Sequence, residues 1–173
     1  MLAYHDEEWG VPVHDDTELF ERLALESFQA GLSWQTILNK REAFRAAFRG
    51  FEPTTVAAFD DDDRARLMAD AGIVRNRAKV GATIENARVL LALAAELGSF
   101  DAYLQSTVPG PPPILPRTAV GGSIPATTPV SDALSADLKR RGMRFVGSTI
   151  VYSFMQSVGL VDDHLPGCFR YRG

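Results

Sequence analysis

One carboxylate falls on the apolar face of a predicted helix. Glu26 stands seven residues after Leu19 and three after Leu23, which are the spacings of neighbours on one helix face. An isolated buried carboxylate is energetically costly unless it is paired or protonated. A structural ion pair, or a hydrogen bond at a helix end, is the ordinary explanation of such a residue. The alternative is an acid at the floor of a pocket, where it would recognise a ligand.

Aromatic residues close to this carboxylate favour the second alternative. Trp34 follows a predicted turn at Gly31, which would fold the indole back towards the acid. Trp9 lies near Tyr4 in the segment AYHDEEWG. Trp9 and Trp34 are the only two tryptophans of the chain. Aromatic side chains usually fill a core, but ring faces also attract positive charge, and a carboxylate accepts hydrogen bonds from amines and ring N–H groups. An aromatic cage with an acid at its base suits a flat, cationic or electron-poor ring.

The C-terminal segment VDDHLPGCFRYRG holds a second set of reactive side chains. His164 is one of three histidines, and Cys168, four residues further on, is the only cysteine. A histidine and a cysteine at this spacing can both bind a metal ion, but two ligands do not make a structural metal site. Because a single cysteine cannot form an internal disulfide, the composition favours a reducing, cytoplasmic environment.

A third candidate site lies in the segment LMADAGIVRNRAK, residues 67–79. Here one predicted helix ends, Gly72 allows a tight turn, and a new helix begins near Asn76. Exposed N–H groups at the start of a helix, with basic side chains nearby, can bind phosphate. A plain corner between two helices would look similar. The basic residues that follow the glycine are Arg75, Arg77 and Lys79.

Helical periodicity dominates the segments that must position these residues, and no strand alternation or internal repeat is present. The fold class is therefore predicted to be all-α, in a single domain over residues 1–173. A proline-rich segment, 109–129, is expected to be a loop. Helices are predicted over about 16–30, 33–49, 53–59, 60–69, 76–97, 131–138 and 146–158, with Ser131 as the cap of the sixth.

Composition and charge narrow the class of protein. The chain has 173 residues, 46% apolar and 23% charged, which is typical of a globular protein with a real core. No apolar run is long enough to cross a membrane, so no membrane partner is expected. The net charge of −4 argues weakly against nucleic acid. Bases nevertheless cluster within 139–144, and a cluster of this kind is by default a solvated helix surface.

Five segments together resemble one family, the 3-methyladenine DNA glycosylase I family, a zinc-containing branch of the helix-hairpin-helix glycosylases. They cover most of the chain in the right order, and several such blocks are far more specific than one short motif. The region 99–129 has no clear counterpart. The segments are AYHDEEWGVP (3–12), LESFQAGLSWQTIL (25–38), DAGIVRNRAK (70–79), SDALSADLKRRGMRFVGSTIVYSFMQSVGLVDDH (131–164) and HLPGC (164–168).

The resemblance implies a role for each candidate residue. Glu26 matches the acid that recognises the alkylated base and serves as the catalytic residue. The aromatics that match the enclosure of the base are Trp34, Tyr4 and Trp9. The implied reaction is hydrolysis of the bond between sugar and base after the base has been flipped out of the duplex. The expected partner is alkylated double-stranded DNA, the products are free 3-methyladenine and an abasic site, and the protein is expected to be a monomer.

The resemblance also assigns the DNA contacts. Gly72 and the bases after it match the hairpin that holds the DNA backbone, over about residues 67–80. Gln29 and Leu32 occupy the loop expected to press into the gap left by the extruded base. The bases carried over with the hairpin are Arg75, Arg77 and Lys79.

The resemblance answers what a metal would do near the C-terminus. The family's structural zinc joins the two ends of the chain, here segments 1–10 and 160–173, through two ligands from each end. His5, His164 and Cys168 match three of the four ligands, and the fourth is a cysteine that precedes AYHDEEWG in the family. Because structural zinc requires four protein ligands, we expect zinc to be substoichiometric in this chain. His14 lies outside the pattern and is expected at the surface.

Two other classes of function compete with the glycosylase. A protein that binds damaged DNA without catalysis would keep the pocket but not turn over, and base release with time separates the two. A general all-α interaction protein unrelated to DNA would not bind methylated duplex in a salt-dependent way.

Overall fold

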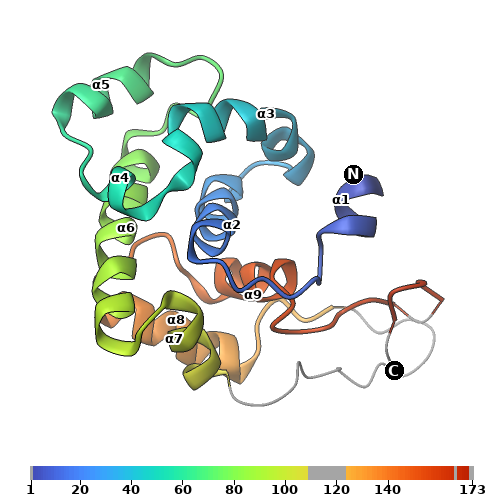
Figure 1. The fold of residues 1–173 in the computed structure, drawn as a ribbon. Helices are drawn as coiled ribbons and strands as arrows, with labels where there is room; N and C mark the ends of the chain where they lie inside the picture. Colours follow the sequence, from blue (N-terminus) through green and yellow to red (C-terminus); the bar gives the residue numbers. More distant parts are fainter. Residues whose placement is uncertain (1, 109–123, 166, 172–173) are drawn as a thin grey trace.

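The computed structural model describes residues 2–108, 124–165 and 167–171. In this part of the chain the secondary structure is helical and contains no strand, so the all-α prediction is confirmed (Figure 1). Most of the predicted loop 109–129 lies outside the described residues. The elements are α1 Leu2–Glu7, α2 Asp16–Gln29, α3 Trp34–Ala47, the 3-10 turn η1 Arg49–Phe51, α4 Pro53–Ala57, α5 Asp61–Ala69, α6 Arg77–Leu97, α7 Phe100–Thr107, α8 Pro129–Arg140 and α9 Ser148–Ser157.

Helix α2 lies at the centre of the molecule, with α9, α3, α6 and α7 packed around it (Figure 1). The carboxylate of Asp15 caps its first turn by accepting from the N–H of Glu18 at 2.9 Å. The helix ends before Gly31, whose φ of +84° favours glycine. Because neighbours surround α2, its side chains are buried almost all round, and Leu23 and Phe28 are 0% exposed.

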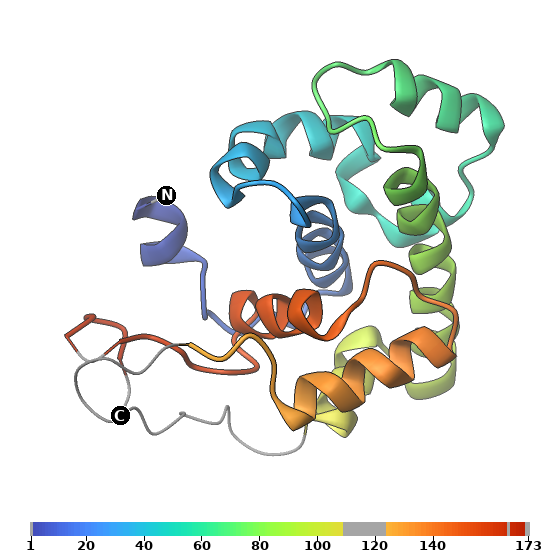
Figure 2. The ribbon, with the colours of Figure 1, turned by 180° about the vertical axis from the view of Figure 1, so that it is seen from behind.

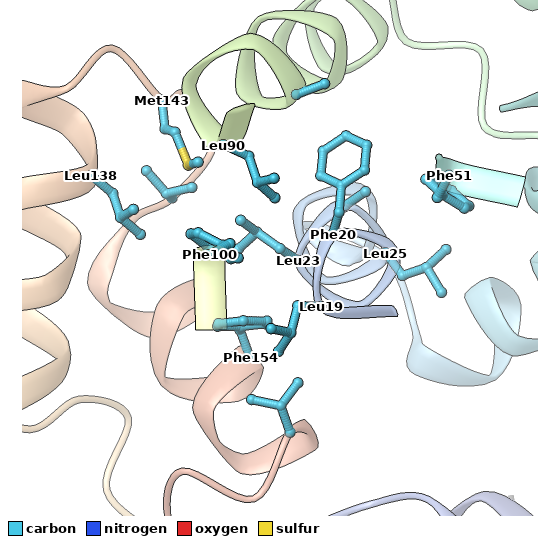
Figure 3. Close-up of a cluster of buried hydrophobic side chains, with 14 of the residues drawn as sticks. Leu19, Phe20, Leu23, Leu25, Phe51, Leu90, Phe100, Leu138, Met143 and Phe154 are labelled. Carbon is cyan, nitrogen blue, oxygen red and sulfur yellow. The ribbon is translucent and has the colours of Figure 1, made fainter. Parts of the chain in front are cut away.

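The core extends from α2 in both directions (Figure 3). Leu19 and Leu23 lie beside Phe100 of α7 and Phe154 of α9 in this view, and Phe20 faces Phe51. The rings of that last pair are 6.1 Å apart between centroids and nearly perpendicular, a favourable aromatic arrangement. This packing makes α2 a rigid support for any side chain that projects from its less crowded end.

The largest differences from the sequence prediction are two helices that it missed and the start of α8. Helices α1 and α7 were not predicted, since six and eight residues are too few to show a clear apolar period. The start of α7 is capped from a distance by Asp16, which accepts from the N–H groups of Phe100 and Asp101 at 2.8 and 3.0 Å. The cap of helix α8 lies three residues earlier than predicted, at Thr128. Ser131 completes the capping box from the third position and is not the cap itself.

The first helix and the last segment of the chain lie on the same side of the molecule in both views (Figures 1 and 2). The guanidinium of Arg170 donates to the carbonyl of Asp6, at 2.7 Å from Nε. The two ends of the described chain therefore meet, as the resemblance implied. Among the described residues, no helix is long and apolar enough to span a membrane.

Candidate active site

A cavity of about 320 Å³ opens between α1, the end of α2, the start of α3 and α9. The four residues predicted to recognise a ring, together with Gln29, lie in its wall. Leu32, predicted beside Gln29, is 39% exposed on the neighbouring turn and does not line the cavity. The lining residues are Tyr4, His5, Trp9, Glu26, Gln29, Trp34, Ser153 and Gln156.

The carboxyl group of Glu26 is buried without a partner. The residue is 6% exposed, and it makes no hydrogen bond or ion pair with the part of the chain that the structure describes. Burial raises the pKa of Glu26 from 4.5 to about 8, and the positive charge of Arg22 opposes this increase only in part. In the ligand-free pocket the carboxyl therefore holds a proton at neutral pH, and a cationic ligand would favour the ionised form.

Two further polar groups of the cavity walls lack a partner among the described residues. The hydroxyl of Tyr4 and the indole N–H of Trp34 are both buried and unbonded. Their rings lie 5.4 Å apart between centroids at 54°. Burial, with the nearby negative charge of Glu26, raises the pKa of the Tyr4 hydroxyl. Buried polar groups normally pair with something, so this cavity offers two donors and one carboxyl to a ligand.

A cluster with the chemistry of a metal site adjoins this cavity. The candidate ligand atoms of His5, His164 and Cys168 lie within 4.8 Å of one another, with the Cys168 sulfur 3.6 Å from Nε2 of His5. Each histidine uses its Nδ1 for a carboxylate, at 2.8 Å to Asp6 and 2.7 Å to Asp162. Both Nε2 atoms are thereby directed at the cluster, and that of His164 is buried without a protein partner among the described residues. Two imidazoles and a thiol are a fitting donor set for zinc.

The connection between α5 and α6 has the predicted turn at Gly72, for a different reason. A Cβ atom there would lie 2.9 Å from an Asp70 oxygen and 3.0 Å from the Cβ of Ala43. Close approach of α3 therefore requires the glycine, whose N–H donates to the Asp70 carboxylate at 2.7 Å. Arg75 and Arg77 project into solvent from this connection and have no ion pair with the described residues.

Lys79 does not belong to that exposed surface, so its prediction as a DNA-binding base is wrong. It is 7% exposed, and its ammonium donates to the carbonyls of Phe28 and Ala30 at 2.9 and 2.7 Å. Burial lowers its pKa. These bonds satisfy carbonyls left open at the end of α2 and fix the turn that carries Leu32. The ammonium of Lys79 therefore has a structural role at the end of α2, next to the residues that line the cavity.

A model of the methyladenine glycosylase family matches residues 1–171 of the chain. The chain belongs to this family. It is 50% identical over 172 residues to DNA-3-methyladenine glycosylase 1 of Escherichia coli K12, covering 99% of this chain and 91% of that protein. It is 46% identical over 167 residues to DNA-3-methyladenine glycosylase of Haemophilus influenzae, covering 96% and 90%. The predicted family is thus confirmed.

Solved structures of the family share the fold. A crystal structure of 3-methyladenine DNA glycosylase I matches with a TM-score of 0.92 at 50% identity, over 98% of this chain and 93% of that one. The Staphylococcus aureus enzyme, studied for its recognition of 3-methyladenine, matches with a TM-score of 0.91 at 42% identity, over 96% and 88%. A variant of 3-methyladenine DNA glycosylase I solved with 3-methyladenine also matches with a TM-score of 0.91, over 96% and 89%.

In this member of the methyladenine glycosylase family, α9 supplies two pocket residues that sequence reasoning missed. Ser153 and Gln156 project into the cavity, and the amide of Gln156 also donates to Asp163 at 2.6 Å. Both are polar residues within the stretch 150–156, which is otherwise apolar or aromatic. That contrast is the signal by which the sequence could have identified them.

An ion-pair network that the sequence did not reveal holds α1 of this methyladenine glycosylase against α2 and α3. One carboxylate oxygen of Glu8 accepts from Arg22 at 2.8 Å and from Arg41 at 2.6 Å. The side chains of these arginines are 2% and 10% exposed. Arg41 also donates to Glu21 at 2.6 Å. Since Tyr4, His5 and Trp9 belong to the same N-terminal element, this network positions one wall of the cavity.

Proposed function

We propose that this chain acts as a monomer that hydrolyses the N-glycosidic bond of 3-methyladenine in alkylated double-stranded DNA. The observation that supports this most directly is the cavity in which Glu26 has no partner among the described residues and a pKa of about 8. Two donors that have no partner in the described part of the chain, on Tyr4 and Trp34, lie in the same cavity. The named relatives are glycosylases of this specificity, and one solved relative holds 3-methyladenine itself.

The pocket discriminates through charge. Methylation at N3 makes adenine within DNA cationic, and a cationic ring is attracted both to the faces of Tyr4 and Trp34 and to an ionised Glu26. Neutral adenine provides no charge to stabilise the carboxylate, so it meets a protonated acid. Only the cationic damaged base offsets the free energy needed to ionise Glu26. The pocket therefore binds 3-methyladenine in preference to unmodified adenine.

The reaction needs little activation of the base. The bond between N9 and the sugar breaks, its electrons remain on the purine, and the cationic base leaves as a neutral molecule. Water adds to C1′ of the sugar and loses a proton, which leaves an abasic site. The contribution of Glu26 is to bind and orient the flipped base while its positive charge is still present.

We assign DNA binding to the turn after α2 and to the α5–α6 connection. Leu32 projects from the turn after α2, and the amide of Gln29 braces this turn by donating to the Leu32 carbonyl at 2.8 Å. We propose that Leu32 fills the gap left by the flipped base. Gly72, Arg75 and Arg77 of the α5–α6 connection are proposed to hold the backbone as a helix-hairpin-helix element.

We propose that the cluster of His5, His164 and Cys168 binds zinc as a structural metal. Bound zinc would tie the N-terminal element to the C-terminal segment. Because a closed structural site uses four protein ligands and this cluster offers three, occupancy below one zinc per chain is expected after purification. Elemental analysis of the purified protein, with a Cys168→Ser variant as the background, measures it. One tightly held zinc per chain, resistant to a chelator, would contradict the expectation.

The test of the function is release of free 3-methyladenine from methylated duplex DNA, followed over time. Catalysis predicts that release continues beyond one base per protein molecule. A protein that binds damaged DNA without turnover would retain the duplex and release no base. Absence of both release and salt-dependent duplex binding would support the unrelated interaction protein.

A further inference from the structure

A basic hollow of about 350 Å³ lies beside the α5–α6 connection. It is formed where the first turns of α6 meet α5 and the turn between α8 and α9. Three arginines line it, and small residues leave room between them. The lining residues are Arg64, Arg77, Ala78, Gly81, Ala82, Glu85, Gly142 and Arg144.

The charges of this basic hollow are unevenly neutralised. Glu85 is the one carboxylate among its lining residues, and it pairs with Arg88 at 2.7 Å and with Arg64 at 3.7 Å. Arg77 and Arg144 are exposed, and neither has an ion pair within the described ranges. The hollow therefore presents two uncompensated guanidinium groups from separate elements, which favours an anion with more than one oxygen, such as phosphate.

The backbone that carries Arg144 is held unusually firmly. The buried amide of Asn86 accepts from the N–H of Arg144 at 2.8 Å and donates to its carbonyl at 2.9 Å. The next carbonyl, of Phe145, accepts from Ser27 of α2 at 2.9 Å. Phe145 has a φ of +55°, an uncommon conformation for a residue with a side chain, so the surrounding bonds fix a strained turn. A strained backbone conformation persists only where the surrounding structure fixes it, so the position of the turn that carries Arg144 is well defined.

Hydrogen bonds connect both the α8–α9 turn and the start of α6 to the end of α2, which lines the cavity. Ser27, which holds the turn between α8 and α9, precedes Gln29 by two residues on α2. Lys79, two residues after Arg77, binds the carbonyls at the end of the same helix. In Figure 2 this turn passes between α2 and α6. A duplex seated on the Leu32 turn and the α5–α6 connection would continue along this side of the protein.

We propose that Arg144, together with Arg77, binds a backbone phosphate of the DNA duplex, extending the DNA contact from the α5–α6 connection to the turn between α8 and α9. This inference rests on the proposed function. It assigns to the α8–α9 turn the task of holding the duplex at a fixed position relative to the cavity. Phosphate contacts position a duplex without reading its sequence, so the contact serves damaged and undamaged DNA alike.

The test compares Arg144→Gln with Lys139→Gln, which removes one positive charge from an exposed residue of α8 that does not line the hollow. Binding to a duplex that holds a tetrahydrofuran abasic analogue is measured by fluorescence anisotropy at several salt concentrations. Loss of one phosphate contact makes the negative slope of log K, the association constant, against log salt less steep by about 0.9. It also weakens binding about eightfold at 0.1 M salt. Lys139→Gln is expected to keep the parent slope. Glu85→Gln, which removes the carboxylate, is expected to bind more tightly than the parent.

Two readouts separate this inference from the proposed function and from misfolding. Binding of free 3-methyladenine is expected to be unchanged in Arg144→Gln, because the cavity does not include this residue. Parental duplex binding and slope in Arg144→Gln would overturn the inference while leaving the glycosylase intact. Loss of free-base binding would assign Arg144 a structural role and also overturn it. Failure of the parent to bind any duplex would overturn the proposed function and this inference together.

Discussion

Replacing Glu26 with glutamine is expected to stabilise the protein above pH 8 while removing most of its base release. The stability effect follows from the pKa of about 8, against an ordinary value of 4.5. Because the folded state holds this proton more tightly than the unfolded state, the free energy of unfolding falls as pH rises from about 4.5 to 8. A shift of this size corresponds to at most roughly 5 kcal/mol. Glutamine does not titrate and resembles the protonated acid in shape.

The two proteins should therefore be about equally stable at pH 5, and the variant should be the more stable at pH 9. Urea denaturation at both pH values measures the difference. The matched control is Glu21→Gln in the same helix. Glu21 is equally buried but accepts from Arg41 and Arg45 at 2.6 and 3.0 Å, so its replacement breaks paired charges and should destabilise the protein.

Base release by Glu26→Gln should fall by about a hundredfold or more. A hydrogen bond to a charged group contributes about 1.5–3 kcal/mol, and the amide also lacks the negative charge that selects a cationic ring. Single-turnover release of 3-methyladenine from methylated duplex measures this loss apart from product release. Normal release by a folded variant would remove Glu26 from the mechanism. A variant destabilised at pH 9 would show instead that the carboxylate has a structural partner.

The sequence predicted the position of Glu26 because helical periodicity is a local property. Spacing alone placed the residue on the buried face of α2, and the structure keeps it there without a partner among the described residues. Trp34 was predictable for a similar reason, since Ser33 and Gly31 define a short connection between two helices. The gathering of His5 with His164 and Cys168 was not local, and only the resemblance to a known family brought these residues together.

Lys79 shows where sequence reasoning fails. Its position in the first turn of α6, next to two exposed arginines, is typical of a solvated base. Its role is decided by the carbonyls of Phe28 and Ala30, about fifty residues earlier in the chain. Neither partner has a side chain that identifies it, because a backbone carbonyl is present at every residue. Contacts of this kind require tertiary structure before they can be assigned.

Replacing Glu8 with glutamine is expected to release α1 from the rest of the protein without unfolding the core. Glu8 is the carboxylate that joins α1 to the buried guanidinium groups of Arg22 and Arg41. An amide cannot balance those charges, and leaving a buried charge partly unpaired typically costs about 3–5 kcal/mol. Most of that cost falls on the contact with α1, since Glu21 still pairs with Arg41 at 2.6 Å.

Hydrogen exchange measures the release directly. Amides of residues 2–9 should exchange at least about tenfold faster in the variant, whereas amides of α2 keep their protection. Free 3-methyladenine should bind at least about tenfold more weakly, because Tyr4 and Trp9 reach the cavity only when α1 is docked, and the apparent Kd rises as that fraction falls. A chelator in all samples prevents metal at His5 from docking α1 independently.

The neighbouring Glu7→Gln is the matched control, since it removes the same charge from the exposed last residue of α1. It should leave both exchange and base binding at parental values. Faster exchange across α2 and α3 in Glu8→Gln would show that the network supports the core and not the position of α1. Unchanged base binding despite a released α1 would show that Glu26 and Trp34 hold the base without it. The expected result makes Glu8 a positioning residue, which acts on the base only through the aromatic wall that it holds in place.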